Sequence, residues 1–216
     1  VPGGGGLTHI GTGTLILSGA NTYTGLTSIL GGVLEVRNGA AIINAGLVSV
    51  GAAGTFRVTN SETIGGLSGA GAVTVAGGNN LTVANGSGAF GGSVSGAGGL
   101  VVSGGSLTLG GALTQAAGTT ISGGANVTLT GTASSNGTVF TVNDTGSLTV
   151  AATGAVNSGM FSAVVMNGAG STVSNLGSIN NASPNGDGLG AAVLSQIGSG
   201  SNVINNGSAS NGTASL

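Results

Sequence analysis

Few residues of this chain have side chains that carry out chemistry. The chain has neither cysteine nor lysine, its one histidine is His9, and its four acids are Glu35, Glu62, Asp144 and Asp187. Glycoside-cleaving enzymes need two carboxyl groups close together, and the spacing of these acids implies no such pair. A Ser-His-Asp triad would depend on His9, which stands in a glycine-rich N-terminal segment. We therefore predict no catalytic residue and expect that the chain is not an enzyme.

Metal and cofactor sites are not expected either. Asn185–Gly190 has the pattern of one calcium-binding nonapeptide of a β-solenoid, but such sites repeat it on consecutive turns and this chain has one copy with one aspartate. The glycines of Gly3–Gly6 lack the Lys-Ser/Thr of a phosphate-binding loop. We predict no metal-ligating residue, no cofactor-binding residue and no cofactor. Because Pro184 does not fit a central strand, we expect Ala182–Gly190 to project as a loop.

Charge is scarce in this chain. Charged residues make up 3% of the sequence, and Arg37 and Arg57 are its only fixed cations. Nucleic acids and acidic lipid surfaces are held by rows of cations, so we expect neither as a partner. No apolar run approaches the ~20 residues of a membrane-spanning helix, and we expect no membrane insertion of this segment. We expect exposed ion pairs of Glu35 with Arg37 and of Glu62 with Arg57.

Short strands are the elements that must position these residues. Runs of three or four residues alternate apolar side chains with Ser, Thr or Asn, which is the period of a strand with one buried face. Leu107, Val127 and Leu148 recur at nearly equal spacing, about 20 residues apart, which is a plausible coil length for a β-solenoid. The residues predicted to point inward are Leu15, Leu17, Ile29, Leu34, Val36, Val73, Val75, Leu81, Val83, Leu107, Leu109, Val127, Leu129, Leu148, Val150, Val173 and Val203.

Residues 13–36 carry the clearest motif, G-T-L-I-L-S-G-A-N-T-Y-T-G-L-T-S-I-L-G-G-V-L-E-V. It resembles the passenger-associated repeat of bacterial autotransporters, whose pattern is G-x-L-x-L-x-G-x-N-T-Y-T-G-x-T-x-I-x-x-G-x-L-x-V. Weaker likenesses extend the resemblance over residues 11–130, although Ala112–Gln115 stand where Asn-Thr-Tyr-Thr is expected. Tyr23 belongs to that corner of the motif, and we expect it to be a packed structural residue.

The C-terminal part carries a second repeat. Gly168–Ile179 aligns with Gly198–Ala209 without a gap, and the two copies share the pattern G-x-G-S-x-V-x-N-x-G-S. This pattern is also similar to autotransporter passengers. We expect one β-helical segment over residues 1–216, with passenger-repeat-like coils over 11–152 and the second repeat type over 153–216.

Together these features predict an all-β protein that forms a right-handed parallel β-helix, or β-solenoid, of about ten coils. The resemblance implies an internal or N-terminal piece of an autotransporter passenger, without the C-terminal translocator barrel that the full protein would carry. It also implies a bacterial cell-surface (outer-membrane) or secreted location. The implied role is a non-enzymatic adhesin or structural stalk, with a host protein or glycan as partner. Two alternatives stay open, namely a self-associating extracellular fibre or biofilm element and a scaffold for an enzymatic domain outside this segment.

Overall fold

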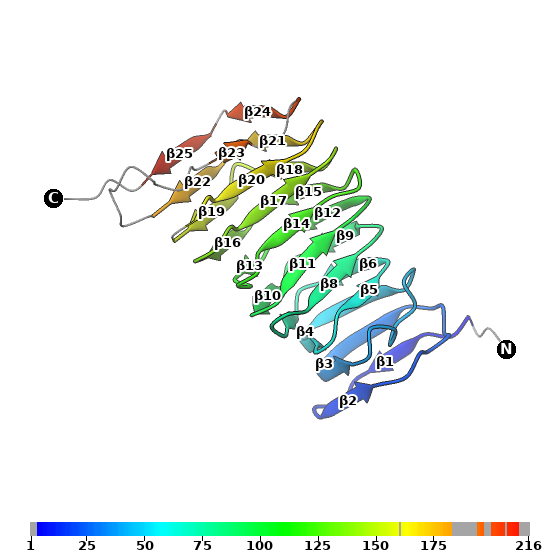
Figure 1. Ribbon diagram of the computed structural model, residues 1–216. Helices are drawn as coiled ribbons and strands as arrows, with labels where there is room; N and C mark the ends of the chain where they lie inside the picture. The colour runs from blue at the N-terminus through cyan, green and yellow to red at the C-terminus, as the bar shows by residue number, and fades with distance from the viewer. Residues whose placement is uncertain (1–3, 160, 183–193, 197–199, 206, 212–216) are drawn as a thin grey trace.

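Parallel strands wind into a solenoid of about eight turns in the computed structural model (Figure 1). The structure describes residues 4–159, 161–182, 194–196, 200–205 and 207–211. All regular elements in these residues are strands, and none of these residues belongs to a helix that is long and apolar enough to span a bilayer. The prediction of an all-β parallel solenoid is confirmed.

Each complete turn places one strand on each of three faces. The first face holds β1 (Leu7–His9), the beginnings of β3 (Thr27–Val36) and β4 (Leu47–Val58), β6 (Gly66–Gly69), β9 (Ser87–Phe90), β12 (Ser106–Leu109), β15 (Asn126–Leu129), β18 (Ser147–Val150), β21 (Thr172–Asn175) and β24 (Asn202–Asn205). The second face holds β2 (Thr14–Leu17), the ends of β3 and β4, β7 (Ala72–Val75), β10 (Ser93–Gly96), β13 (Ala112–Leu113), β16 (Thr132–Ser135), β19 (Ala155–Ser158), β22 (Ser178–Asn181) and β25 (Ser208–Asn211).

The third face is a sheet of seven described strands that begins only in the third turn. Its strands are β5 (Glu62–Ile64), β8 (Asn80–Val83), β11 (Gly99–Val102), β14 (Thr119–Ile121), β17 (Phe140–Asn143), β20 (Val164–Asn167) and β23 (Leu194–Gln196). In the two earlier turns, irregular chain occupies the position of this face, so β5 has its only described strand partner, β8, on one side. Other groups must therefore satisfy the edge of β5.

The strand register tests the predicted coil length of about 20 residues. Leu107 pairs with Val127 and Val127 with Leu148, as their spacing in the sequence predicted. Val173 pairs with Val203, which confirms the alignment of the two C-terminal repeats. The count of ten took about 20 residues for every coil. Ten strands stack on each of the first two faces, but the third face has seven described strands, so fewer than ten turns carry a strand on all three faces. Whether residue 153 separates two kinds of segment stays a prediction.

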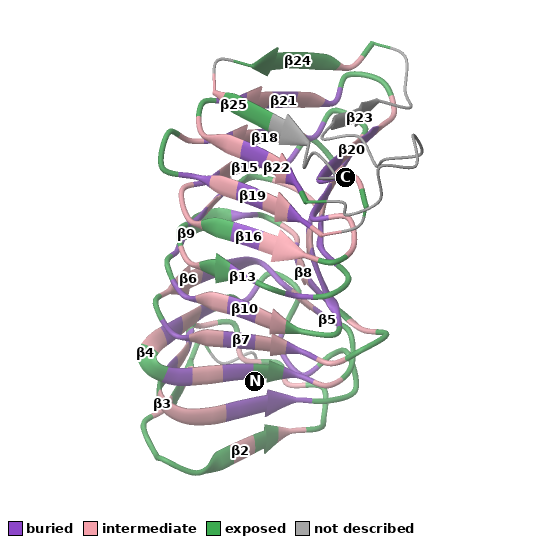
Figure 2. Ribbon diagram, turned by 90° about the vertical axis from the view of Figure 1, so that its left-hand side faces the viewer, coloured by how far each residue is buried: buried purple, intermediate pink, exposed green. Residues whose placement is uncertain are grey.

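The interior is a column of aliphatic side chains with three fully buried phenylalanines, Phe56, Phe90 and Phe140. Most of the predicted inward residues are buried. Leu15 and Leu17 also face the core but are half-buried, because β2 pairs with β3 alone. Val203 is 37% exposed, so its prediction as a core residue is wrong. Its strand β24 pairs only with β21 in the described residues, and Figure 2 shows β24 as exposed.

Toward the C-terminus, amides replace aliphatic side chains inside the stack. Asn175 is fully buried one turn beyond Val150, with which it pairs. Its amide nitrogen donates to Asn205 Oδ1 at 2.8 Å and to the carbonyl oxygen of Ser208 at 3.0 Å. Its amide oxygen accepts from the backbone N–H of Gly177 at 3.1 Å. The buried amide is thus satisfied at both ends, and it links two successive turns.

Glycines form a second column, at the corner between the first and second faces. A Cβ at any of them would lie within 2.4 Å of a backbone carbonyl oxygen of the preceding turn. At Gly92 that oxygen belongs to Gly71, and at Gly111 it belongs to Gly92. Close approach of the turns therefore requires glycine at this corner. The column consists of Gly71, Gly92, Gly111, Gly131, Gly154, Gly177 and Gly207.

Candidate functional site

Glu35 lies between the two arginines on the outer side of the second face. Its carboxylate accepts hydrogen bonds from Arg37 Nε at 2.5 Å and from Arg57 Nη1 at 3.2 Å. The hydrogen bond from Arg37 is the main cause that lowers the pKa of Glu35 below its usual value, and Arg57 adds to it against the opposing effect of burial. The predicted pairing of Glu35 with Arg37 is confirmed, but Glu35 is buried rather than exposed. Arg57 joins the same cluster, because β3 and β4 place it beside Glu35 in register.

The predicted ion pair between Glu62 and Arg57 is wrong. Glu62 is 2% exposed, and its carboxylate accepts from the backbone N–H groups of Ala41 at 3.2 Å and Ile42 at 2.7 Å. The chain turns from the second face to the third between Arg57 and Glu62, so the two side chains diverge despite their closeness in sequence. Glu62 begins β5, and its carboxylate holds the irregular chain beneath that strand where no strand lies.

Burial sets the ionisation of Glu62. It raises the pKa of this carboxyl group, and the two backbone hydrogen bonds act in the opposite direction. The described residues form ion pairs only around Glu35, so Glu62 depends on backbone N–H groups for its partners. Such a carboxylate is a structural clamp, since both of its oxygens are already engaged.

The Asn-Thr-Tyr-Thr corner of the motif lies two turns before Glu62, on the other side of the Ala41 segment. Asn21 Nδ2 donates to the carbonyl oxygen of Ala41 at 2.7 Å, and the Tyr23 hydroxyl is 2.8 Å from Thr27 Oγ1. Burial raises the pKa of Tyr23, the hydrogen bond with Thr27 opposes this, and the charge of Glu62 adds to the rise. Asn21 and Glu62 thus hold the Ala41 segment from the turns on either side of it.

The remaining ionisable residues of the described chain, His9 and Asp144, lie in different turns of the solenoid. His9 lies in β1, and its Nε2 is 3.2 Å from the carbonyl oxygen of Gly13. Asp144 is exposed in the turn after β17. Among the described residues, no three His, Cys, Asp or Glu side chains come together as metal ligands would. Asp187 and the segment Asn185–Gly190, including most of the predicted loop, lie outside the described residues.

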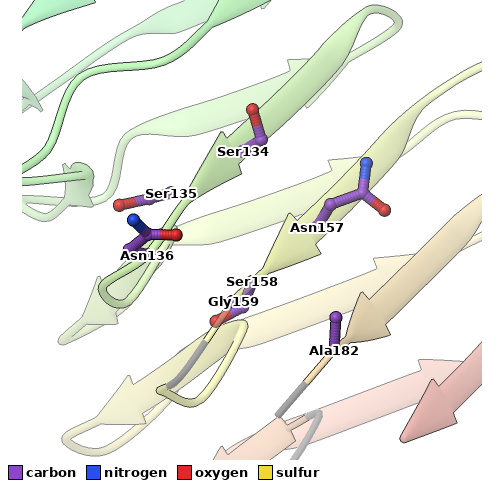
Figure 3. A pocket seen from close by; sticks show the side chains of 7 residues that line it. All are labelled: Ser134, Ser135, Asn136, Asn157, Ser158, Gly159 and Ala182. Atoms are coloured by element: carbon purple, nitrogen blue, oxygen red, sulfur yellow. The ribbon is translucent and has the colours of Figure 1, made fainter. Parts of the chain in front are cut away.

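A polar hollow of about 340 Å³ opens on the second face, near the ends of β16 and β19 (Figure 3). It spans neighbouring turns, because Ser134 pairs with Asn157 and Ser135 with Ser158. The hollow is lined by Ser134, Ser135, Asn136, Asn157, Ser158, Gly159 and Ala182. All of these residues are uncharged, so the chemistry that the hollow offers is hydrogen bonding by hydroxyl and amide groups.

Sequence reasoning did not single out the hollow. The runs Ser134–Gly137 and Asn157–Gly159 have the composition of ordinary turns. They meet only because the coil between β16 and β19 is longer than the coil before it, as the pairing of Ser134 with Asn157 shows. The irregular coil length hides this juxtaposition from a search for a fixed period.

Comparison with known proteins identifies the N-terminal turns. Residues 7–36 match the passenger-associated-transport-repeat family. This span contains β1, β2 and β3, the Asn-Thr-Tyr-Thr corner and Glu35. Comparison with curated proteins and with solved structures gives no match. The family match and the parallel β-solenoid agree with the resemblance seen in the sequence, and residues 7–36 are a passenger-associated transport repeat of the autotransporter type.

Proposed function

We propose that the chain is an autotransporter passenger segment, displayed on the surface of a Gram-negative bacterium or secreted from it, that acts as a non-enzymatic adhesin or stalk. The match of residues 7–36 carries the proposal. The fold supports it, because a solenoid grows in one dimension and presents long faces for contact. The described faces carry mainly hydroxyl, amide and small side chains, which suits repeated weak contacts better than one reaction centre.

Surface display of the whole chain tests this proposal. The chain would be placed between a secretion signal and the translocator barrel of an unrelated autotransporter, in a Gram-negative host. We expect the chain to be cleaved by external protease on intact cells, and the displaying cells to bind epithelial cells or matrix proteins more than cells with the barrel alone. Display without added adhesion would favour the stalk role. Failure to reach the surface would contradict the passenger assignment.

Self-association is a second candidate, favoured by the pairing of the terminal strands. Within the described residues, β1 pairs only with β3, and β24 only with β21. The other edges of β1 and β24 expose backbone groups that can pair with another chain. With a net charge of −2, electrostatic repulsion between chains is small. Sedimentation of the isolated chain at rising concentration tests this: growing species support a fibre, and a constant monomer contradicts it.

A further inference from the structure

We propose that the polar hollow near β16 and β19 is a binding site for a neutral saccharide. The inference rests on the proposed adhesin role and names the class of ligand that this part of the surface would hold. Its volume of about 340 Å³ lies at the lower end of the range of about 300–1,000 Å³ typical of small-ligand sites.

Three side chains around the hollow keep polar groups available for a ligand. Ser134 Oγ and the side-chain amide of Asn136 have no hydrogen-bond partner among the described residues. Asn157 Oδ1 accepts from Asn180 Nδ2 at 3.1 Å, which fixes the amide and leaves Asn157 Nδ2 to donate elsewhere. Figure 3 shows Ser134 and Asn157 on neighbouring strands and Asn136 just beyond the end of β16. Donors and acceptors are thus grouped as sugar hydroxyls require.

The floor of the hollow is held by the other polar residues. Ser135 Oγ donates to the carbonyl oxygen of Ala116 at 3.3 Å and accepts from the N–H of Gly137 at 3.0 Å. Ser158 Oγ donates toward the carbonyl oxygen of Gly137 at 3.3 Å and contacts that of Phe161. These contacts tie neighbouring turns together, so a ligand would meet a preorganised surface.

Small residues create the empty space. A Cβ at Gly159 would lie 2.7 Å from Asn136 Oδ1, so the missing side chain makes room for the Asn136 amide. Ala182 extends the small floor into the next turn. Phe161, whose backbone is tied to Ser158, is 58% exposed.

Other ligand classes fit the hollow less well. A phosphate or an acidic peptide needs cationic partners, and the lining residues are uncharged. A peptide that adds a strand needs a free strand edge, but β19 is paired with β16 on one side and β22 on the other. An amphipathic helix needs a groove lined by large apolar side chains, whereas the side chains here are those of serine, asparagine and alanine. These contrasts favour a neutral saccharide.

Nuclear magnetic resonance of the isotopically labelled whole chain tests the proposal, with cellotriose, chitotriose and lactose as probes. We expect at least one probe to bind with a Kd on the order of 1 mM, as befits an open site with few contacts. The shifted backbone amides should be those of the lining residues, namely Ser134–Asn136, Asn157–Gly159 and Ala182. Asn157→Ala should weaken binding about fivefold to tenfold, which is the loss of one hydrogen bond.

Two further variants separate a specific site from a general effect on the fold. Gly159→Ala keeps every polar group of the site but narrows its floor, and it should weaken binding as well. Asn126→Ala removes an exposed asparagine from the first face, and it should leave binding unchanged. Circular dichroism of each variant checks that the solenoid is retained.

The proposal is overturned if none of the three saccharides shifts these amides, or if binding survives both Asn157→Ala and Gly159→Ala in folded protein. Binding of trialanine at these amides in place of the saccharides would also overturn it. Each of these results overturns only the saccharide site. The adhesin proposal is still supported if cells that display the chain adhere more than cells with the barrel alone. Loss of adhesion in the displayed wild-type chain would count against the adhesin role alone, because saccharide binding is measured separately.

Discussion

The carboxylate of Glu62 accepts a hydrogen bond from the backbone N–H of Ile42, 2.7 Å away and one turn earlier in the chain. It also accepts from Ala41 N–H, whose carbonyl oxygen in turn accepts from Asn21 Nδ2. Three successive turns are thus joined on the side where the first two have no strand. At the edge of the third face, where no strand precedes β5, the Glu62 carboxylate accepts the backbone hydrogen bonds that connect β5 to the preceding turn.

Glu62 should make the solenoid more stable in mild acid. Burial raises its folded-state pKa above the unfolded value of about 4.3, so its contribution to stability is fullest below that value and is lost as the pH rises through the folded pKa. Glu62→Gln removes this titration. The free energy of unfolding of the wild type, minus that of Glu62→Gln, should therefore fall as the pH rises above the unfolded value of about 4.3. Urea unfolding measures it, and a constant difference would contradict the assignment.

Glu35 should show the opposite pH dependence and serves as the matched control. Its folded-state pKa is lowered, mainly by Arg37, so its contribution is present above the unfolded value and is lost as the pH falls through the folded pKa. The stability of the wild type relative to Glu35→Gln should fall as the pH drops below about 4.3, whereas its stability relative to Glu62→Gln should fall as the pH rises above that value. Added salt should reduce the Glu35 effect, since both arginine side chains are substantially exposed. The same slope for both variants would refute this pair of predictions.

Alanine in the glycine column should be strongly destabilising. A Cβ at Gly111 would lie 1.9 Å from the carbonyl oxygen of Gly92, and backbone cannot yield as a side chain does. We expect Gly111→Ala to lower the free energy of unfolding by about 3 kcal/mol or more. Gly13→Ala is the control, because nothing lies within 4 Å of a Cβ there, and it should change stability by at most about 0.5 kcal/mol. If thermal unfolding showed the same loss of stability for Gly111→Ala and Gly13→Ala, a steric clash between the Cβ at residue 111 and the preceding turn would be ruled out as the cause.

The buried amide of Asn175 should hold the last described turns in place. Asn175→Ala leaves the Gly177 N–H and the carbonyl oxygen of Ser208 without these partners, which should cost about 1–3 kcal/mol. Hydrogen exchange should accelerate in β24, whose Asn205 also loses its partner. Asn126→Ala, at an exposed position, should leave exchange in β24 unchanged. Unchanged protection of β24 from hydrogen exchange in Asn175→Ala would show that the hydrogen bonds of the Asn175 amide do not stabilise the last described turns.

The sequence predicts the strand stacking well because its signal is local. Leu107, Val127 and Leu148 each lie between polar neighbours, and their spacing alone gives the correct register. The partners of Glu62 lie beyond such reasoning, since they depend on where the chain turns a corner in space. The hollow could not be predicted from the sequence for a related reason. Ser134 pairs with Asn157 because the coil between them is longer than the preceding coil. The motif places Tyr23 in a corner, but the hydrogen bond between its hydroxyl and Thr27 Oγ1 depends on the three-dimensional course of the chain.

The glycine column has a consequence for where this chain can vary in length. The corner that contains it is short: residues 91–92 join β9 to β10, residues 130–131 join β15 to β16, and the longest link that contains one of its glycines is residues 151–154 between β18 and β19. The corner between the second and third faces is extensible, from residues 97–98 after β10 to residues 159–163 after β19. The corner between the first and second faces therefore restricts the length of the chain, while the corner between the second and third faces accommodates insertions without disturbing the stacked strands. The hollow lies at this permissive edge, where loop exchange could alter surface chemistry while the scaffold is kept.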